Sequence, residues 1–183
     1  MENCVKAILY CYPQLEGIEE GYLQHIRNRA VMSVDGKEPA QKVAEYLALA
    51  VLEKAKIREL NRLTVAAMDK LSTEEKLLLS VRYFGKLDRV KRVFAEKYAG
   101  IADEKMRTIP YWSERTYFRK QKKLLAKLTE RFARLGLTKE RFEEEFADLD
   151  GIGAIYTYIL LGKDLGLEKK ERAFLEFLQE IRS

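Results

Sequence analysis

Apolar residues recur along this chain at intervals of three and four positions, the spacing expected of helices that bury one face. Three prolines and ten glycines are too few to break these repeats, and we find no strong alternating pattern of the kind that strands show. The pattern therefore predicts an all-α fold. It begins with a short apolar helix from Met1 to Tyr12, stopped by Pro13, and a second helix from Leu15 through Ile26.

The longest periodic segment follows Pro39, which suits the first turn of a helix because its missing N–H would have no partner there. Its apolar positions repeat every seven residues, at Val43, Ala50, Ile57, Thr64 and Leu71, with Tyr46, Leu60 and Ala67 three places further on. Such a seam needs a partner, and the second helix, joined by a loop at residues 30–38, would supply it in an antiparallel hairpin. A homodimer through the same seam is the alternative, and Glu53 within the seam favours the hairpin.

Two capping signals mark the starts of later helices. Ser72 and Glu75 form an S-x-x-E capping box, so a helix should begin here and end near Gly85. Residues 86–98 follow as another amphipathic helix. Ser113 should cap a helix over 114–135, because Trp112 and Tyr117 occupy the positions of a hydrophobic staple around it. The buried stripe of that helix is expected at Tyr117, Leu124, Leu128, Phe132 and Leu135, with Gly136 as its stop.

The C-terminal part of the chain predicts three shorter helices. Thr138 can cap the first, whose apolar residues are Phe142, Phe146 and Leu149, and residues 150–153 separate it from helices near 154–161 and 167–182. This tail is either a separate helical unit or a cover for the core. The chain thus divides into a helical hairpin at 1–71, a central unit at 72–136 and a tail at 137–183.

Charge is distributed unevenly over these three parts. Residues 72–136 contain 17 Lys and Arg against 8 Asp and Glu, a net charge of +9. The first part is neutral, with 10 of each sign, and the tail has 7 against 11, a net charge of −4. The basic excess therefore belongs to the central unit.

Much of this excess lies on the helix after Ser113. A rotation of about 100° per residue places Arg115, Arg119 and Lys122 opposite the apolar stripe, and Thr116, Lys120 and Lys123 on the flank. Arginines can bind guanine, a threonine methyl can contact thymine, and lysines can bind phosphate. The face therefore suits the major groove of DNA. A solvated basic surface is the simpler alternative.

Other classes of protein find little support. No apolar run reaches the roughly 18 residues that span a bilayer, and Glu2 does not suit a signal peptide, so we expect a cytoplasmic protein without a membrane partner. Cys4 and Cys11 are too far apart on one helix for a disulfide and should be small, half-buried apolar residues. One histidine, His25, cannot supply a zinc site, and no cofactor is expected. The carboxylates at 143–145 spread around a helix, so we expect no enzyme.

Three segments share their residues with a known family. The first extends from Leu71 to Gly85, with Ser72, Glu74, Glu75, Leu78, Leu79, Arg82, Tyr83 and Phe84; the second is Phe94-Ala95-Glu96-Lys97-Tyr98; the third is Ser113-Glu114-Arg115-Thr116-Tyr117 followed by Arg119. In these segments the chain resembles region 4 of sigma-70-type factors and the small phage-encoded regulators akin to it, including the ArpU-type regulators. The start, Leu9-Tyr10-x-Tyr12-Pro13-x-Leu15, is also similar to those phage proteins. The resemblance spans roughly residues 5–135 and leaves 137–183 uncovered.

This resemblance implies a helix-turn-helix unit in which the helix after Ser113 is the recognition helix and residues 82–85 are scaffold. The DNA contacts implied are Arg115, Thr116, Arg119, Lys120 and Lys123, and the cationic face adds Lys122. Double-stranded DNA and RNA polymerase are the partners implied. The chain departs from the family at residues 99–112, an insertion where a tight turn is usual.

We therefore expect a DNA-binding transcriptional regulator of phage or prophage type that acts by binding, not by catalysis. The alternative is a protein-interaction module, such as an adaptor or an inhibitor of a transcription complex, that retains the fold without binding DNA. The insertion and the acidic tail, which could shield the basic face, are the observations that support this alternative.

Overall fold

The computed structural model describes residues 1–32, 39–84, 113–149 and 151–161, and these residues form helices and no strand. The predicted all-α class is confirmed. In chain order the elements are α1 (Glu2–Cys11), the short 3-10 helix η1 (Tyr12–Gln14), α2 (Leu15–Met32), α3 (Ala40–Met68), α4 (Thr73–Arg82), α6 (Glu114–Arg134), α7 (Lys139–Glu145) and α8 (Ile152–Leu160). Most of the loop at 30–38, Gly85, the helix predicted at 86–98, the insertion with Trp112, and the helix predicted at 167–182 lie outside the described residues.

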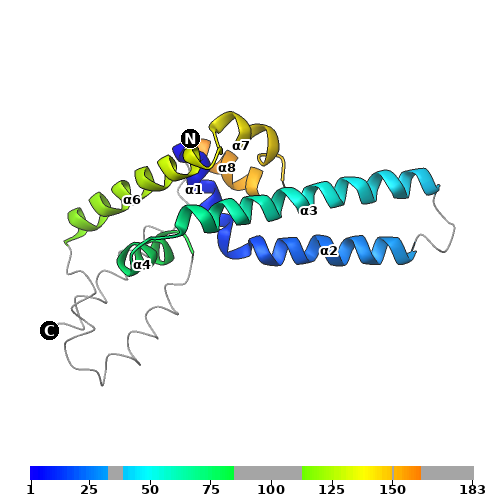
Figure 1. Cartoon of the computed structure of the whole chain (residues 1–183), viewed down its shortest axis with the longest axis horizontal. Helices are drawn as coiled ribbons and strands as arrows, with labels where there is room; N and C mark the ends of the chain where they lie inside the picture. The colour runs from blue at the N-terminus through cyan, green and yellow to red at the C-terminus, as the bar shows by residue number, and fades with distance from the viewer. Residues whose placement is uncertain (33–38, 85–112, 150, 162–183) are drawn as a thin grey trace, which may run out of the picture.

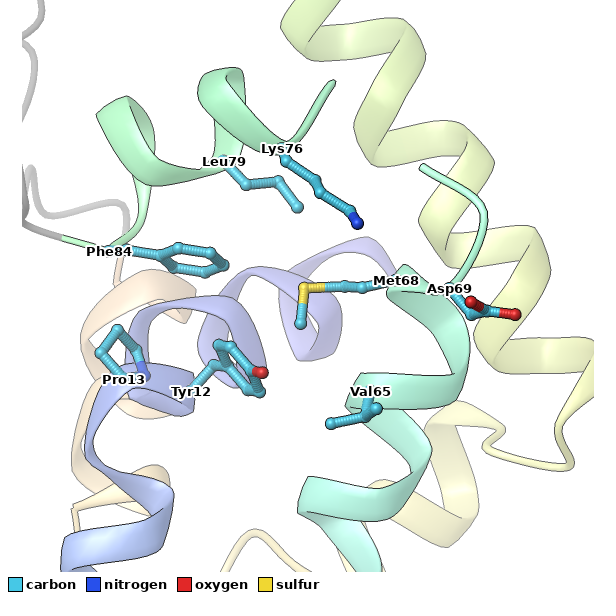
Figure 2. Close-up of a pocket in the computed structure, with 8 residues that line it drawn as sticks. All are labelled: Tyr12, Pro13, Val65, Met68, Asp69, Lys76, Leu79 and Phe84. Carbon is cyan, nitrogen blue, oxygen red and sulfur yellow. The ribbon is translucent and has the colours of Figure 1, made fainter. Parts of the chain in front are cut away.

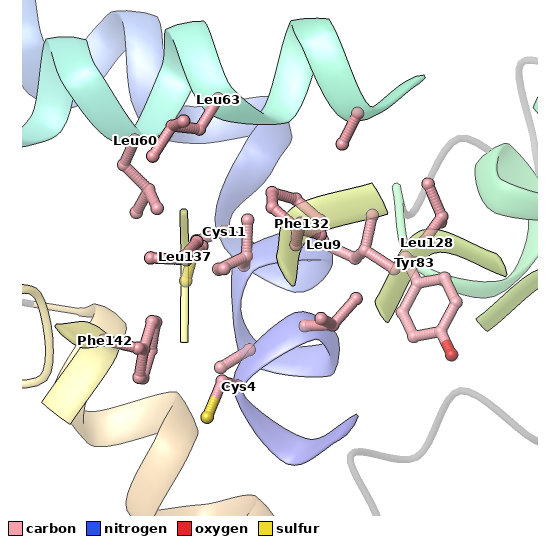
Figure 3. Packing of buried hydrophobic residues seen from close by; sticks show 14 of the residues in the cluster. Cys4, Leu9, Cys11, Leu60, Leu63, Tyr83, Leu128, Phe132, Leu137 and Phe142 are labelled. Atoms are coloured by element: carbon pink, nitrogen blue, oxygen red, sulfur yellow. The ribbon is translucent and has the colours of Figure 1, made fainter. Parts of the chain in front are cut away.

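Helix α1 lies at the centre of the hydrophobic core. Six of its ten residues are buried: Cys4, Val5, Ala7, Ile8, Leu9 and Cys11. A helix that is apolar on most sides must be enclosed by other elements, and α3, α6 and α8 pack against this one. Figure 3 shows Leu60 and Leu63 of α3 and Phe132 of α6 in the packing around α1. The N-terminal segment is therefore the element that joins the rest of the fold.

Helices α2 and α3 form the predicted hairpin and lie side by side along most of their length (Figure 1). The heptad positions in α3 are all buried, at Val43, Ala50, Ile57 and Thr64, and so is Leu71 just beyond the helix, whereas Tyr46 is partly exposed. The seam is thus occupied within one chain. The surroundings of the seam change along α3. In the outer half of the hairpin, the half nearer residues 33–38, Val43 and Ala50 are buried but lie outside the main core cluster, whereas Ile57 belongs to it.

The predicted capping box at the start of α4 is confirmed. The Glu75 backbone N–H donates to Ser72 Oγ at 3.2 Å, and the Ser72 backbone N–H donates to Glu75 Oε2 at 3.0 Å. These bonds satisfy N–H groups that have no partner inside the helix, which fixes the start of α4 directly after α3. At the other end of α4, Tyr83 stacks edge-on against Tyr10 of α1, with ring centroids 4.9 Å apart.

Helix α6 ends as predicted at Gly136, whose φ of +80° belongs to the left-handed region that glycine favours. Its buried stripe differs from the prediction at one position, since Leu135 is 36% exposed. The chain leaves the helix there, and the Leu137 N–H bonds back to the Phe132 carbonyl at 3.0 Å, which turns the Leu137 side chain into the core instead. Gln121 and Leu125 complete the buried stripe.

The described part of the tail, through residue 161, packs on α1 as a cover. Thr138 caps α7 as predicted, accepting a bond from the Arg141 N–H at 3.2 Å, and Phe142 and Phe146 are fully buried in the same cluster as α1. Helix α8 lies against α1, where Tyr156 donates to Glu143 Oε1 of α7 at 2.7 Å. Burial, together with this bond to a carboxylate, raises the pKa of the Tyr156 hydroxyl.

Both cysteines are free thiols and are more deeply buried than the sequence predicted. Cys4 is in contact with the Tyr156 hydroxyl, with the sulfur 3.8 Å from the oxygen. Burial raises the pKa of the Cys11 thiol to about 12, so this group stays protonated at neutral pH. Cys4 and Cys11 therefore act as small apolar residues of the core.

The join between α7 and α8 provides a test of this packing. A Cβ added at Gly153 would overlap the backbone carbonyl oxygen of Ala147, which cannot move aside as a flexible side chain could. We expect Gly153→Ala to lower the free energy of unfolding by about 1–3 kcal/mol. The measurement is urea unfolding followed by circular dichroism.

Gly21→Ala is the matched control. Nothing lies within 4 Å of a Cβ at Gly21 in α2, so this change should raise stability by about 0.5–1 kcal/mol through helix propensity. Equal effects of the two substitutions would show that the contact at Ala147 does not form.

Candidate nucleic-acid interface

The N-terminus of α6 is fixed by Ser113, as the sequence predicted. Its Oγ accepts a bond from the Thr116 N–H at 3.4 Å and also contacts Thr116 Oγ1 at 3.1 Å. Thr116 is half-buried and part of this cap. Its side chain therefore contributes to the start of the helix as well as to the surface beside it.

Four of the predicted contact residues share one exposed face on the first half of α6. Arg115, Arg119, Lys122 and Lys123 are all solvent-exposed and project away from the buried stripe. At about 1.5 Å of rise per residue, the face is about 12 Å long, close to the width of the DNA major groove. The structure thus brings four cations together on one side of one helix.

Lys120 is placed differently from these four. Its Nζ donates to Glu74 Oε1 of α4 at 2.7 Å, and the side chain is only one-third exposed. A carboxylate of the same chain therefore offsets its charge, and the side chain links α6 to α4. This pairing lies on the flank of the cationic face, at its border with α4.

A second ion pair and a buried amide hold α4 against α6. Lys127 Nζ donates to both carboxylate oxygens of Glu75, at 2.7 and 2.9 Å. Gln121 Nε2 donates to the Leu78 carbonyl at 2.9 Å and to the Tyr117 hydroxyl at 3.1 Å. We call Glu74, Glu75, Lys120, Gln121 and Lys127 the α4–α6 clamp.

Burial alone would raise the pKa of the Glu75 carboxyl. The hydrogen bonds from Lys127 and from the Ser72 backbone N–H outweigh that effect and hold its pKa below the ordinary value. Glu75 is thus ionised at neutral pH, where it serves the capping box and the clamp together.

Arg131 links α6 to the end of α3. Its guanidinium donates to the carbonyls of Ala67, at 3.0 Å, and Asp69, two groups at the C-terminus of α3 that lack partners within the helix. Basic residues of α6 therefore divide into two sets. One set binds groups of the same chain and consists of Lys120, Lys127, Arg131 and Arg134, and the other faces solvent and consists of Arg115, Arg119, Lys122 and Lys123.

Sequence periodicity did not identify the clamp. Gln121 lies four residues after Tyr117 on the buried stripe, which is the one local signal for its burial. The pairing of Lys127 with Glu75 joins residues 52 positions apart and depends on how α4 and α6 cross. No helical spacing within either element indicates it.

A pocket of about 390 Å³ lies beside α4. Figure 2 shows it between η1, the end of α3 and α4, with these lining residues: Tyr12, Pro13, Val65, Met68, Asp69, Lys76, Leu79 and Phe84. Its walls are mostly apolar, and Tyr12 and Phe84 stack there with ring centroids 5.3 Å apart. Throughout the described ranges we find no group of three or more His, Cys, Asp or Glu side chains that could hold a metal ion. Within the same ranges no helix is both long and apolar enough to cross a bilayer.

Comparison with protein-family models, curated proteins and solved structures yields no match to this chain. The exposed cationic face of α6 is therefore the feature that bears on function.

The clamp predicts a pH-dependent stability. Glu75→Gln removes the carboxylate charge while retaining a side chain suited to the capping box, and should lower the free energy of unfolding at pH 7 by about 0.5–1 kcal/mol. Because the pKa of Glu75 is depressed in the folded protein, its contribution is present above the unfolded value of about 4.3 and is lost as pH falls through the folded value. Urea unfolding at pH 7 and at stepwise lower pH measures the difference.

The control is the same substitution in a Lys127→Gln background. There the ion pair is already absent, so Glu75→Gln should cost clearly less. An equal cost in both backgrounds, or a cost that persists in acid, would contradict the assignment.

Proposed function

We propose that this chain is a DNA-binding transcriptional regulator of phage or prophage type, similar to sigma region 4, in which the first half of α6 contacts DNA. The observation that supports the proposal is the exposed cationic face of Arg115, Arg119, Lys122 and Lys123. The resemblance in the segments around Ser72 and Ser113 adds RNA polymerase as the expected protein partner.

The order of side chains along α6 fits contact with a duplex. Recognition helices present the residues of their N-terminal turns to base edges, and Arg115 and Arg119 belong to those turns. Lys122 and Lys123 follow further along, where a helix leaves the groove and meets phosphates. The N-terminus of α6 also favours phosphate, since its first N–H groups carry partial positive charge.

The α4–α6 clamp supports the same function by fixing the direction in which the face projects. Lys120 and Lys127 are held by Glu74 and Glu75, so the flank toward α4 is close to neutral. The positive potential is thus concentrated on the outward side of α6. A helix held by ion pairs and by the Gln121 amide also needs less ordering when it binds, which favours affinity.

The first test is fluorescence-anisotropy binding to random-sequence duplex DNA at low and at physiological salt. We expect affinity that falls steeply with salt because each phosphate contact releases counterions. In an Arg115→Ala/Arg119→Ala/Lys123→Ala variant, binding should weaken strongly and the slope of log affinity against log salt should fall by about 2–3.

The matched control removes three exposed cations from the hairpin: Arg27→Ala/Lys42→Ala/Arg58→Ala. It changes the net charge equally, so its binding should stay close to that of the wild type. No binding by the wild type at either salt would overturn the proposal and favour the adaptor or inhibitor. Equal losses in the two variants would show attraction by net charge alone.

Base recognition and phosphate contact by α6 can be measured separately once a preferred DNA sequence has been selected. Arg119→Ala should weaken binding to that site by about 1–3 kcal/mol and relax the preference at one position. Lys122→Ala should weaken binding to all duplexes by a similar factor. Unchanged affinity of Arg119→Ala for the selected site would remove α6 as the recognition helix.

A further inference from the structure

The outer half of α3 is apolar on two sides whose centres lie about 130° apart around the helix. One side is the seam with Val43 and Ala50, which is buried. On the other side Leu49 and Leu52 are 61% and 59% exposed, and Ala48 and Ala55 beside them are exposed as well. A helix that is apolar on two sides normally lies between two partners, and among the described elements α2 alone lies beside this half of α3 (Figure 1).

This half of the hairpin is also poorly enclosed. Figure 1 shows it extending away from α1, α4, α6 and α8. Leu15 is the one described residue of α2 that is buried, although the helix is 18 residues long. A two-helix projection with so little buried surface would gain stability from a further helix against α3.

The charges along the exposed side of α3 indicate which helix would pack against it. Glu45, Leu49, Leu52 and Lys56 follow one another at intervals of four, three and four residues, and so form one stripe. The stripe has an acidic end, an apolar middle and a basic end. When it is reversed, the basic end lies opposite the acidic end, so the stripe is complementary to an antiparallel copy of itself.

We propose that this stripe is the interface of a homodimer in which two copies of α3 pack antiparallel about a two-fold axis at the level of residues 50 and 51. Leu49 of one copy faces Leu52 of the other, and Glu45 of one copy faces Lys56 of the other. Each contact occurs twice, as an isologous interface requires. Parallel packing would instead place like charges opposite one another, which disfavours that arrangement.

The axial spacing fits the pairing of antiparallel helices. The stripe has the alternating four- and three-residue spacing of the a and d positions of a coiled coil. In an antiparallel pair, each a position of one helix faces a d position of the other. Small Ala48 and Ala55 flank the leucines and let the helices approach. The surface is distinct from the seam already filled by α2 and from the cationic face of α6, so this inference does not depend on DNA binding.

The oligomeric state tests the proposal directly. Light scattering coupled to size-exclusion chromatography over a range of concentrations should give a mass approaching twice 21.4 kDa at the higher concentrations. The Leu49→Glu/Leu52→Glu variant should stay at the monomer mass and keep its helical circular dichroism, because both side chains are exposed in one chain.

Val65→Glu is the matched control. Val65 is 52% exposed on the same helix but lies 13 residues beyond Leu52, about 20 Å along the helix axis, so the dimer should persist in this variant. A wild-type mass of 21.4 kDa at every concentration would overturn the proposal, and the stripe would then be free for a different protein. A dimer that survives Leu49→Glu/Leu52→Glu would overturn it equally.

Charge reversal tests the antiparallel register. Glu45→Lys alone and Lys56→Glu alone should each weaken the homodimer about tenfold, because each would place like charges together twice. A mixture of the two variants should form a heterodimer with affinity close to that of the wild type, since both charge pairs become complementary again. Failure of the mixture to associate would exclude this register.

Discussion

Burial of α1 is the constraint on which the rest of the structure depends. Six residues of this short helix are buried, and no single neighbour could cover surfaces that point in so many directions. The chain meets this requirement with α3 from the hairpin, α6 from the basic unit and α8 from the tail. Segments that differ in charge along the sequence therefore share one hydrophobic core.

This shared core gives α6 two halves with different environments. Its second half is anchored in the core by Leu128 and Phe132, and Arg131 binds the carbonyls that end α3. Its first half is held by polar contacts with α4 and keeps one side open to solvent. Exposed cations on a helix that is already fixed need less ordering when they bind a partner.

Local signals predicted the elements of this fold well. The capping box of Ser72 and Glu75, the Ser113 cap and the buried heptad of α3 each depend on residues within a few turns of one another, and the structure confirms all three. The prediction that Leu135 is buried was wrong because helical periodicity assumes that the helix continues. The turn at Gly136 ends the helix and buries Leu137 instead.

Contacts between elements could not be predicted in the same way. Lys120 and Lys123 are both cationic and lie 60° apart in a helical projection, with Lys120 nearer the buried stripe. The projection does not show which carboxylate Lys120 meets, because its pairing with Glu74 depends on the position of α4. The part of the candidate site that depends on α6 alone was therefore visible in the sequence, and the part that depends on its neighbour was not.

The positions of the two proposed surfaces have a consequence for how they could act together. About 18 residues of α3 separate the proposed two-fold axis from the end of α3 near α6, a distance of about 27 Å at 1.5 Å per residue. Because the copies are antiparallel, the ends of the two α3 helices would lie about 54 Å apart, clearly more than one turn of DNA, about 34–36 Å. A dimer would thus bring its cationic faces to separated positions, not to adjacent half-sites. Contact of one α6 with DNA therefore does not require the second copy, and dimerisation does not require DNA.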